Sequence, residues 1–281
     1  MSSATRPLPE APRHPIPVRD PDLDFDASIP NHWLGGSPLA THFFNGLNLV
    51  FPDGERFFIR AVKDHLPRVR DPELREQVKG FFGQEAHHAA EHERYFDVLR
   101  AQGYRIDGFL RRFRAFSRFT NRWLPAPLRL AMTAGAEHYT AAFGVLALED
   151  DELLQRAHPT MRRLILWHAT EEIEHKAVAF DVLKEVHPSY VLRVLGFALA
   201  TLILFGWTIA ATRMLLRQDG FSRAEVAAQR EQVRRVTGGG REERLGRAAR
   251  EYLRRDFHPG QVDDLPLARR RLAELGLEVP A

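Results

Sequence analysis

The chain contains no cysteine among its 281 residues. This absence excludes disulfide bonds, thiolate metal ligands and cysteine nucleophiles. Any metal ion must therefore be held by histidine and carboxylate side chains, and the sequence offers 13 histidines and 37 acidic residues. With 44% hydrophobic and 27% charged residues, the composition is that of a globular protein that can bury a sizeable core.

Signals for secretion and for nucleic-acid binding are also missing. The opening segment, MSSATRPLPEAPRHPIPVRD, is rich in proline and arginine and lacks the apolar stretch of a secretory signal. We expect an irregular arm over residues 1–37. The formal net charge of +3 is small and no recognition motif accompanies it, so we expect no nucleic-acid partner.

The hydrophobic pattern predicts an all-α protein, because apolar residues recur at intervals of three and four and strand-like alternation is rare. Asp71 and Pro72 are typical of a helix start, and Gly103 of a helix end. The expected helices cover about residues 51–66, with Pro52 and Asp53 as start signals and Pro67 as the stop, and then 72–102, 127–150 and 159–187. These four helices predict a bundle over residues 38–192.

Two further segments are amphipathic or wholly apolar. Residues 109–123 place aromatic side chains on one helical face and arginines on the other, which fits either an ordinary surface helix or one lying in a membrane interface. Residues 194–212 are uncharged, and we assign 193–217 to a hydrophobic helix. At ~1.5 Å per residue the uncharged run reaches ~28 Å, long enough for a bilayer, although a central helix or an oligomer contact is the alternative.

The remainder, residues 218–281, is predicted to be a basic helical tail. Its sequence TGGGREERLGRAAREYLRRDF combines a glycine break with a charged helix. Anionic lipid head groups would be a natural partner for such a tail.

The stretch HATEEIEHK, residues 168–176, contains the pair Glu172 and His175. Residues three apart on a helix leave the same face one turn apart, so both side chains can reach one ion. The same spacing occurs at Glu85 and His88. Two such pairs on separate helices indicate a possible metal site.

A single glutamate precedes each pair on the previous expected helix. Glu55 lies about thirty residues before Glu85, and Glu137 about thirty-five before Glu172. Glu137 stands in the apolar segment LAMTAGAEHYTAAFGVL, where an ionised carboxylate is costly unless it meets a positive charge. One glutamate from each of two helices and Glu-x-x-His from each of two others form the ligand set of ferritin-like di-iron and di-manganese proteins.

His168 shares the helical face of Glu172 and His175, because the three residues are spaced by four and three. The segment H-x-x-x-E-x-x-H can therefore supply three ligands from one helix. The alternative is that His168 is a core histidine or supports a ligand from outside.

For the neighbouring residues we have further expectations. Glu171 could be confused with Glu172 as a ligand, and His92 is expected to support a ligand or to line a substrate pocket. Asp181 is a candidate for orienting a ligand histidine, whereas His138 and Glu174 are expected to be solvated or packing residues.

The order Glu55, Glu85-x-x-His88, Glu137, His168-x-x-x-Glu172-x-x-His175 resembles that of the ferritin-like di-iron oxygenases. With its added histidine it is similar to the seven-ligand arylamine N-oxygenases. The segments GQEAHHAAEHERY and WHATEEIEHKAVAFDV also resemble a bacterial family described as predicted metal-dependent hydrolases. The resemblance covers roughly residues 40–215. It implies that all seven residues bind two metal ions, with His168 as the seventh ligand; no catalytic residue beyond these ligands is identified.

This resemblance implies a ferritin-like four-helix bundle whose two iron ions, or two manganese ions, activate dioxygen to oxidise an apolar or lipid-like substrate with the help of an electron donor. One alternative is a dinuclear hydrolase that uses a metal-bound hydroxide. A second is a non-enzymatic, membrane-attached iron-binding protein. We expect the protein at the cytoplasmic side of a membrane, in contact with its surface or bilayer, with a soluble cytoplasmic protein as the alternative and a homodimer as a possible assembly.

Overall fold

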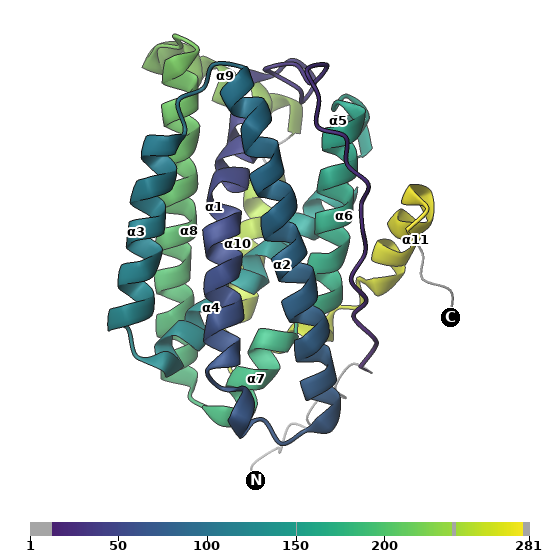
Figure 1. Ribbon diagram of the computed structural model, residues 1–281, viewed down its shortest axis with the longest axis vertical. Coiled ribbons are helices and arrows are strands. Elements are labelled where there is room, and N and C mark those ends of the chain that lie inside the picture. Colours follow the sequence, from purple (N-terminus) through teal and green to yellow (C-terminus); the bar gives the residue numbers. More distant parts are fainter. Residues whose placement is uncertain (1–12, 150, 238–239, 278–281) are drawn as a thin grey trace.

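The computed structural model describes residues 13–149, 151–237 and 240–277. Within these ranges the protein is all-α, as expected, and the only β-type pairing is an isolated bridge between Leu34 and Ala157. The centre is a bundle of α1 (Pro38–Lys63), α2 (Pro72–Ala101), α4 (Ala126–Glu149) and α6 (Pro159–His175). Figure 1 shows these helices running roughly along the long axis of the molecule.

Helix α1 begins thirteen residues earlier than the expected start at residue 51, so that prediction is wrong. The side chain of Ser37 accepts a hydrogen bond from the Ala40 amide, and Pro38 occupies the first turn. Pro52 lies inside the helix and removes one backbone hydrogen bond. Packing of α1 against α2 and α8 offsets that loss.

Helix α2 follows the sequence closely. Asp71 accepts hydrogen bonds from the amides of Glu73 and Leu74, and the chain leaves the helix through Gly103 at a φ of 92°. Helix α4 also begins and ends near its expected bounds. These two helices carry Glu85, His88 and Glu137.

The expected fourth helix is interrupted. Helix α6 ends at His175, and a separate α7 (Val178–Val186) continues after two residues. Lys176 at the break binds Asp264 and the carbonyl of Val262. Neither glycine nor proline lies at the break, so the local sequence does not predict that the helix ends there. A single helix over 159–187 was therefore a wrong prediction.

The apolar segment forms α8 (Tyr190–Gln218), which packs against α4 and α1. Close approach depends on glycine: a Cβ at Gly196 would lie 2.4 Å from the carbonyl carbon of Ala131. The outward face of α8 stays apolar and exposed at Val191, Leu195, Leu202 and Ile209. By length and composition, α8 is the one helix of the described chain that could cross a membrane.

The basic amphipathic segment forms α3 (Asp107–Trp123), beside α1. Phe109 and Phe113 are buried and contact Trp207 of α8. Phe119 and Trp123, farther along the same helix, are 58% and 65% exposed. Its aromatic face is therefore divided between the core and the surface.

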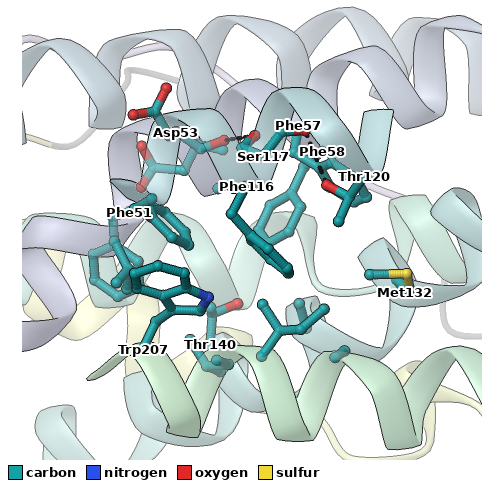
Figure 2. Close-up of a pocket in the computed structure, with 18 residues that line it drawn as sticks. Phe51, Asp53, Phe57, Phe58, Phe116, Ser117, Thr120, Met132, Thr140 and Trp207 are labelled. Atoms are coloured by element: carbon teal, nitrogen blue, oxygen red, sulfur yellow. Dashed lines mark hydrogen bonds between the residues drawn. The ribbon is translucent and has the colours of Figure 1, made fainter. Parts of the chain in front are cut away.

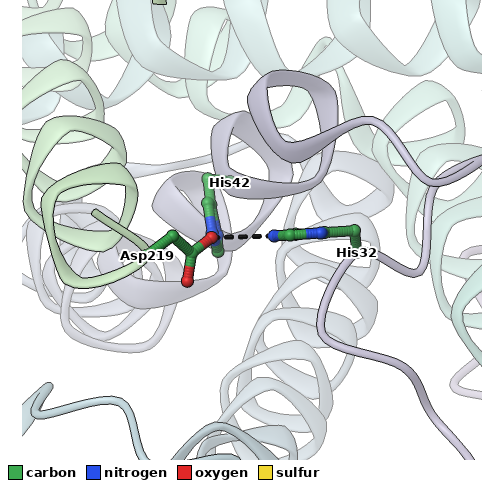
Figure 3. A group of neighbouring side chains, drawn as sticks. All are labelled: His32, His42 and Asp219. Atoms are coloured by element: carbon green, nitrogen blue, oxygen red, sulfur yellow. Dashed lines mark hydrogen bonds and ion pairs between the residues drawn. The ribbon is translucent and has the colours of Figure 1, made fainter. Parts of the chain in front are cut away.

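A polar cluster joins the end of α8 to α1 and to the segment before it (Figure 3). Asp219 Oδ2 lies 2.7 Å from His32 Nε2 and 2.6 Å from His42 Nε2, and its Oδ1 accepts a hydrogen bond from the Tyr104 hydroxyl. All three contacts come from segments far from Asp219 in sequence, so this cluster fixes α8 against the bundle.

Where the structure describes the tail, its helices pack against the bundle. After α9 (Arg223–Thr237), helix α10 (Gly240–Tyr252) packs on α4 and α11 (Leu265–Leu275) packs on α6. Tyr252 is fully buried, stacked on Phe197. The short connecting helices are η1 (Leu66–Arg68), α5 (Asp151–Gln155) and η2 (Pro259–Gln261).

Candidate metal centre

The seven residues expected to bind metal come together in the middle of the bundle. They arrive from four helices: α1, α2, α4 and α6. They form two adjacent groups, and within each group the possible ligand atoms lie within 4.8 Å of one another. The first group is Glu55, His88 and His168, and the second is Glu85, Glu137, Glu172 and His175. All seven are buried.

The second group is centred on His175. Its Nε2 lies 3.2 Å from Glu85 Oε1, 3.3 Å from Glu137 Oε2 and 3.4 Å from Glu172 Oε2. One imidazole nitrogen thus faces three carboxylates from three helices. Glu137 and Glu172 point at the same nitrogen, so α4 and α6 turn their acidic side chains toward each other.

The first group is centred on the other oxygen of Glu172. Its Oε1 lies 2.7 Å from His168 Nε2 and 3.6 Å from His88 Nδ1. Glu55 Oε1 is 3.9 Å from His168 Nε2. The rings of His88 and His168 are close, with centroids 4.1 Å apart. Glu172 therefore directs one oxygen to each group.

Several buried polar atoms of this centre lack partners. Neither oxygen of Glu55, Glu85 or Glu137 accepts a well-formed hydrogen bond from a described residue. Glu172 Oε2, His88 Nδ1 and His175 Nε2 are in the same condition. Buried polar atoms are normally satisfied, and unpaired ones call for a missing partner. Carboxylate oxygens and imidazole nitrogens are donors that divalent metal ions accept, so these unpaired atoms fit a metal site.

The ionisation of the glutamates shows what their burial costs. Loss of water raises the pKa of Glu85 to about 8 and that of Glu137 to about 7, with repulsion from neighbouring carboxylates adding to both. Burial also raises the pKa of Glu55 well above its usual value. Removal from water therefore disfavours the charged form of all three carboxylates, and bound cations would offset that cost.

Glu172 and His175 behave in the opposite way. Burial disfavours their charged forms, but their mutual attraction outweighs it. The pKa of Glu172 is held well below its usual value and that of His175 well above it. The neighbouring carboxylates thus favour the charged form of His175.

A hydrogen-bond network outside the centre orients two of the histidines. His88 presents Nδ1 to the centre and binds Glu171 Oε2 through Nε2 at 3.0 Å. His175 presents Nε2 and binds Gln84 Oε1 through Nδ1 at 2.8 Å. Fixing the far nitrogen sets the tautomer and the direction of a ligand histidine.

Both branches of this network end on Arg19. Its guanidinium lies 3.3 Å from Glu171 Oε1 and 2.7 Å from Glu174 Oε2, and Glu174 in turn accepts a hydrogen bond from Gln84. Arg19 belongs to the irregular N-terminal arm and is only 8% exposed. The arm is therefore built into the surroundings of the centre.

Sequence reasoning missed Arg19 and Gln84, and it interpreted Glu174 as a solvated or packing residue. No spacing rule links an irregular arm to a helix about 150 positions away. Glu171 was recognised only as a residue that could be confused with Glu172. The one signal for Glu171 and Glu174 was their place beside two ligand candidates in a helix that is buried from Trp167 to His175.

Three other histidines or acids beside the motifs have different roles. His92, expected as a supporting or pocket residue, binds His168 Nδ1 through Nε2 at 2.7 Å. His138 binds the carbonyl of Ala248, away from the centre. Asp181, which we considered as a residue orienting a ligand histidine, instead binds His258 of the tail.

Two small apolar cavities adjoin the centre. One has a volume of about 80 Å³ and is bordered by Glu55 together with Phe57, Phe116, Met132 and Trp207 (Figure 2). The other, about 60 Å³, is bordered by His92, His168 and Glu172. Phe51 and Thr140 line both cavities. The centre therefore faces an apolar environment on two sides.

Comparison with known proteins gives one positive result. A family model described as predicted metal-dependent hydrolase matches residues 17–263, which is most of the chain. Neither the curated proteins nor the solved structures contain a match. The matched range includes Arg19 and all seven candidate ligands. The chain belongs to the family of predicted metal-dependent hydrolases.

Proposed function

We propose that this protein holds two iron ions in the seven-residue centre and uses them to oxidise an apolar substrate with dioxygen. The observation that carries the proposal is the position of Glu172, whose two oxygens face two separate groups of carboxylates and imidazoles. A bridging carboxylate within a mixed oxygen and nitrogen donor set suits iron, and manganese accepts the same donors.

The surroundings support oxidation of an apolar molecule. Ferrous ions held by the seven candidate ligands would supply the electrons for the reduction of dioxygen, and an external electron donor would replace those electrons. The protein's own residues orient the ligand histidines and exclude water. Glu171 and Gln84 hold the histidines in place, while Phe51, Phe57 and Trp207 exclude water from the substrate side. Each turnover would insert one oxygen atom into the substrate and release the other as water, with two electrons and two protons from the donor.

A hydrolase is the second candidate, and the family description favours it. Hydrolysis would require groups that stabilise the negative charge developing on the substrate. Among the described residues, no lysine or arginine lines either cavity beside the centre. For this reason we place oxidation first.

We also propose that the protein associates with a membrane through α8 and α3. The exposed face of α8 carries Val191, Leu195 and Leu202, and the exposed end of α3 carries Phe119 and Trp123 among solvent-facing arginines. Aromatic and aliphatic side chains beside basic residues are typical of a surface that enters the interface of an anionic bilayer. Because α8 packs on α1 and α4 along its other face, we favour attachment at the surface over a span.

Metal analysis after anaerobic reconstitution with ferrous iron tests the main proposal. We expect two irons per chain and rapid dioxygen consumption when the loaded protein meets air. The variant Glu172→Ala should lose at least one iron and the dioxygen reaction. Glu149→Gln, which removes a surface ion pair with Arg244, is the matched control and should retain both.

A different set of results would contradict the proposed oxidation. Tightly bound zinc, ester hydrolysis that Glu172→Ala abolishes, and no dioxygen consumption by the iron-loaded protein would establish the hydrolase and refute the oxidase.

A further inference from the structure

A third cavity, larger than the two beside the metal centre, lies between the bundle and the start of the tail. It has a volume of about 540 Å³. Its walls come from α1, α4 and α8, and its outer side from α9 and α10. The inner walls are aliphatic and aromatic, with Phe43, Leu146 and Phe205 among them. A cavity of this size and lining suits a small apolar ligand or an alkyl chain.

The outer part of this cavity is basic. Arg213, Arg230 and Arg241 line it, accompanied by one acidic residue, Glu242. Arg230 lies 3.6 Å from Glu242, whereas Arg213 has no ion-pair partner within the described part of the chain. Burial lowers the pKa of the Arg241 guanidinium, which shows that this charge is partly removed from water. The mouth therefore carries an excess of positive charge.

The inner part of the cavity adjoins one of the small cavities beside the metal centre. It shares Phe44, Leu47, Phe143 and Ala147 with the small cavity that His168 and Glu172 border. That small cavity in turn shares Phe51 and Thr140 with the one beside Glu55. Three cavities thus follow one another along α1, from the arginines to the candidate ligands.

The distance along this path follows from helix geometry. Phe43 borders the large cavity and Phe51 borders both small ones. Eight residues of α-helix at ~1.5 Å each separate them by ~12 Å. A molecule that extends from the part of the large cavity beside Phe43 to the small cavities beside Phe51 must therefore span about that length along α1.

We infer that the substrate is an anionic amphiphile, a long-chain carboxylate whose head binds Arg213 and Arg230 and whose alkyl chain passes the wall shared by the cavities to reach the metal centre. This inference rests on the proposed function for the reaction but not for the binding. The same binding mode determines which substrate carbon is oxidised. A carbon far from the carboxylate head lies beside Glu172 and His168, and the carbons next to the head do not.

Fluorescence titration of the metal-free, full-length protein with cis-parinarate, a fluorescent long-chain carboxylate, tests the inference. We expect saturable binding that dodecanoate displaces, and that dodecanol and butanoate do not. Dodecanol lacks the charge, and butanoate is too short to fill the path. Equal displacement by dodecanol and dodecanoate would overturn the inference.

Variants locate the head and the chain. Arg213→Ala and Arg230→Ala should each weaken dodecanoate binding about tenfold, since each removes a charge-assisted contact. Arg217→Ala, one turn farther along α8 and outside the cavity lining, should bind like the unaltered protein. Ala147→Phe, at the wall shared by two cavities, should abolish binding while circular dichroism reports an unchanged helix content. Unaltered affinity in both Arg213→Ala and Arg230→Ala would refute the assigned head site.

Failure of this inference and of the proposed function can be told apart. Binding is measured without metal or dioxygen, so a protein that binds dodecanoate but takes up no iron contradicts only the proposed function. A protein that takes up two irons and consumes dioxygen, yet binds dodecanol as well as dodecanoate, contradicts only the substrate class.

Discussion

Glu172 is the residue that links the two halves of the centre. Its neighbours include three more glutamates, all buried, and four carboxylates close together in a core repel one another strongly. Two divalent cations carry the charge that balances four carboxylates when the histidines are neutral. The arrangement is thus a poor core for an empty protein and a suitable one for a protein with two bound metal ions.

Metal uptake should depend on pH, because protons must leave before metal ions can bind. Glu85 and Glu137, with pKa values of about 8 and about 7, hold protons near neutrality. Their raised pKa values also mean that the metal-free fold loses stability as pH rises from about 4.5 through about 8. We expect metal affinity to increase roughly tenfold or more between pH 6 and pH 8.

Calorimetric titration with ferrous or manganous ions, in buffers of different ionisation enthalpy, measures both the affinity and the protons released. The stabilisation by metal, seen as a shift in Tm, should grow over the same interval. A Kd that is flat from pH 6 to pH 8, without proton release, would contradict the assignment of these glutamates as ligands.

Arg19 should support both the fold and the metal affinity. Arg19→Ala leaves Glu171 and Glu174 buried without their cation, and removing one partner of a buried ion pair costs about 3 kcal/mol or more. Loss of this support should also weaken metal binding ~10-fold or more. Thermal denaturation and metal titration measure the two effects.

The control for Arg19 is Arg13→Ala in the same arm. Arg13 pairs with Asp71 at a partly exposed site, where an ion pair contributes about 1 kcal/mol or less. If Arg19→Ala were as stable as Arg13→Ala and bound metal normally, the network would have no positioning role.

At the scale of elements, the contact between α4 and α8 depends on a glycine. Gly196→Ala should destabilise the protein by about 1–3 kcal/mol, because the added carbon collides with the backbone of Ala131. Gly206→Ala lies on the same helix with nothing within 4 Å. It should stabilise by up to about 1 kcal/mol through better helix propensity. Urea denaturation of both variants gives the comparison, and equal effects would show that the two helices do not meet as closely as described.

The elements also show where local sequence information stops. Caps and glycines predicted the ends of α2, and apolar content predicted α4, since both signals are local. The start of α1 was misjudged because Pro52 has the local signature of a helix start, while packing on α2 and α8 keeps it inside a longer helix. The break after His175 has no local signature at all.

At the scale of the whole molecule, the exposed apolar face of α8 can contact either a membrane or a second copy of the chain, and we predict the membrane. Replacing Leu195 and Leu202 together by glutamate should abolish co-flotation with anionic phospholipid vesicles, since both side chains lie on the face that would enter the interface. Val262→Glu alters an equally exposed apolar residue of the tail and should leave flotation intact. A protein that ignores vesicles but forms a dimer that the double variant dissociates would show that the face binds another copy.

The candidate ligands could be found from the sequence because helical spacing is a local property. Residues three or four apart must share a face, so Glu85 with His88, and His168 with Glu172 and His175, were paired before any fold was known. Glu137 was found because a carboxylate in an apolar helix needs a partner. These inferences require only the helix and its period.

Tertiary structure alone determined which groups face each other across the bundle. It directed the two oxygens of Glu172 to different groups, connected the histidines through Gln84 and Glu171 to Arg19, and aligned three cavities with a basic mouth. Each of these features joins residues far apart in the chain. Their distances depend on how whole helices pack and on the path of an irregular arm, and neither leaves a periodic signal in the sequence.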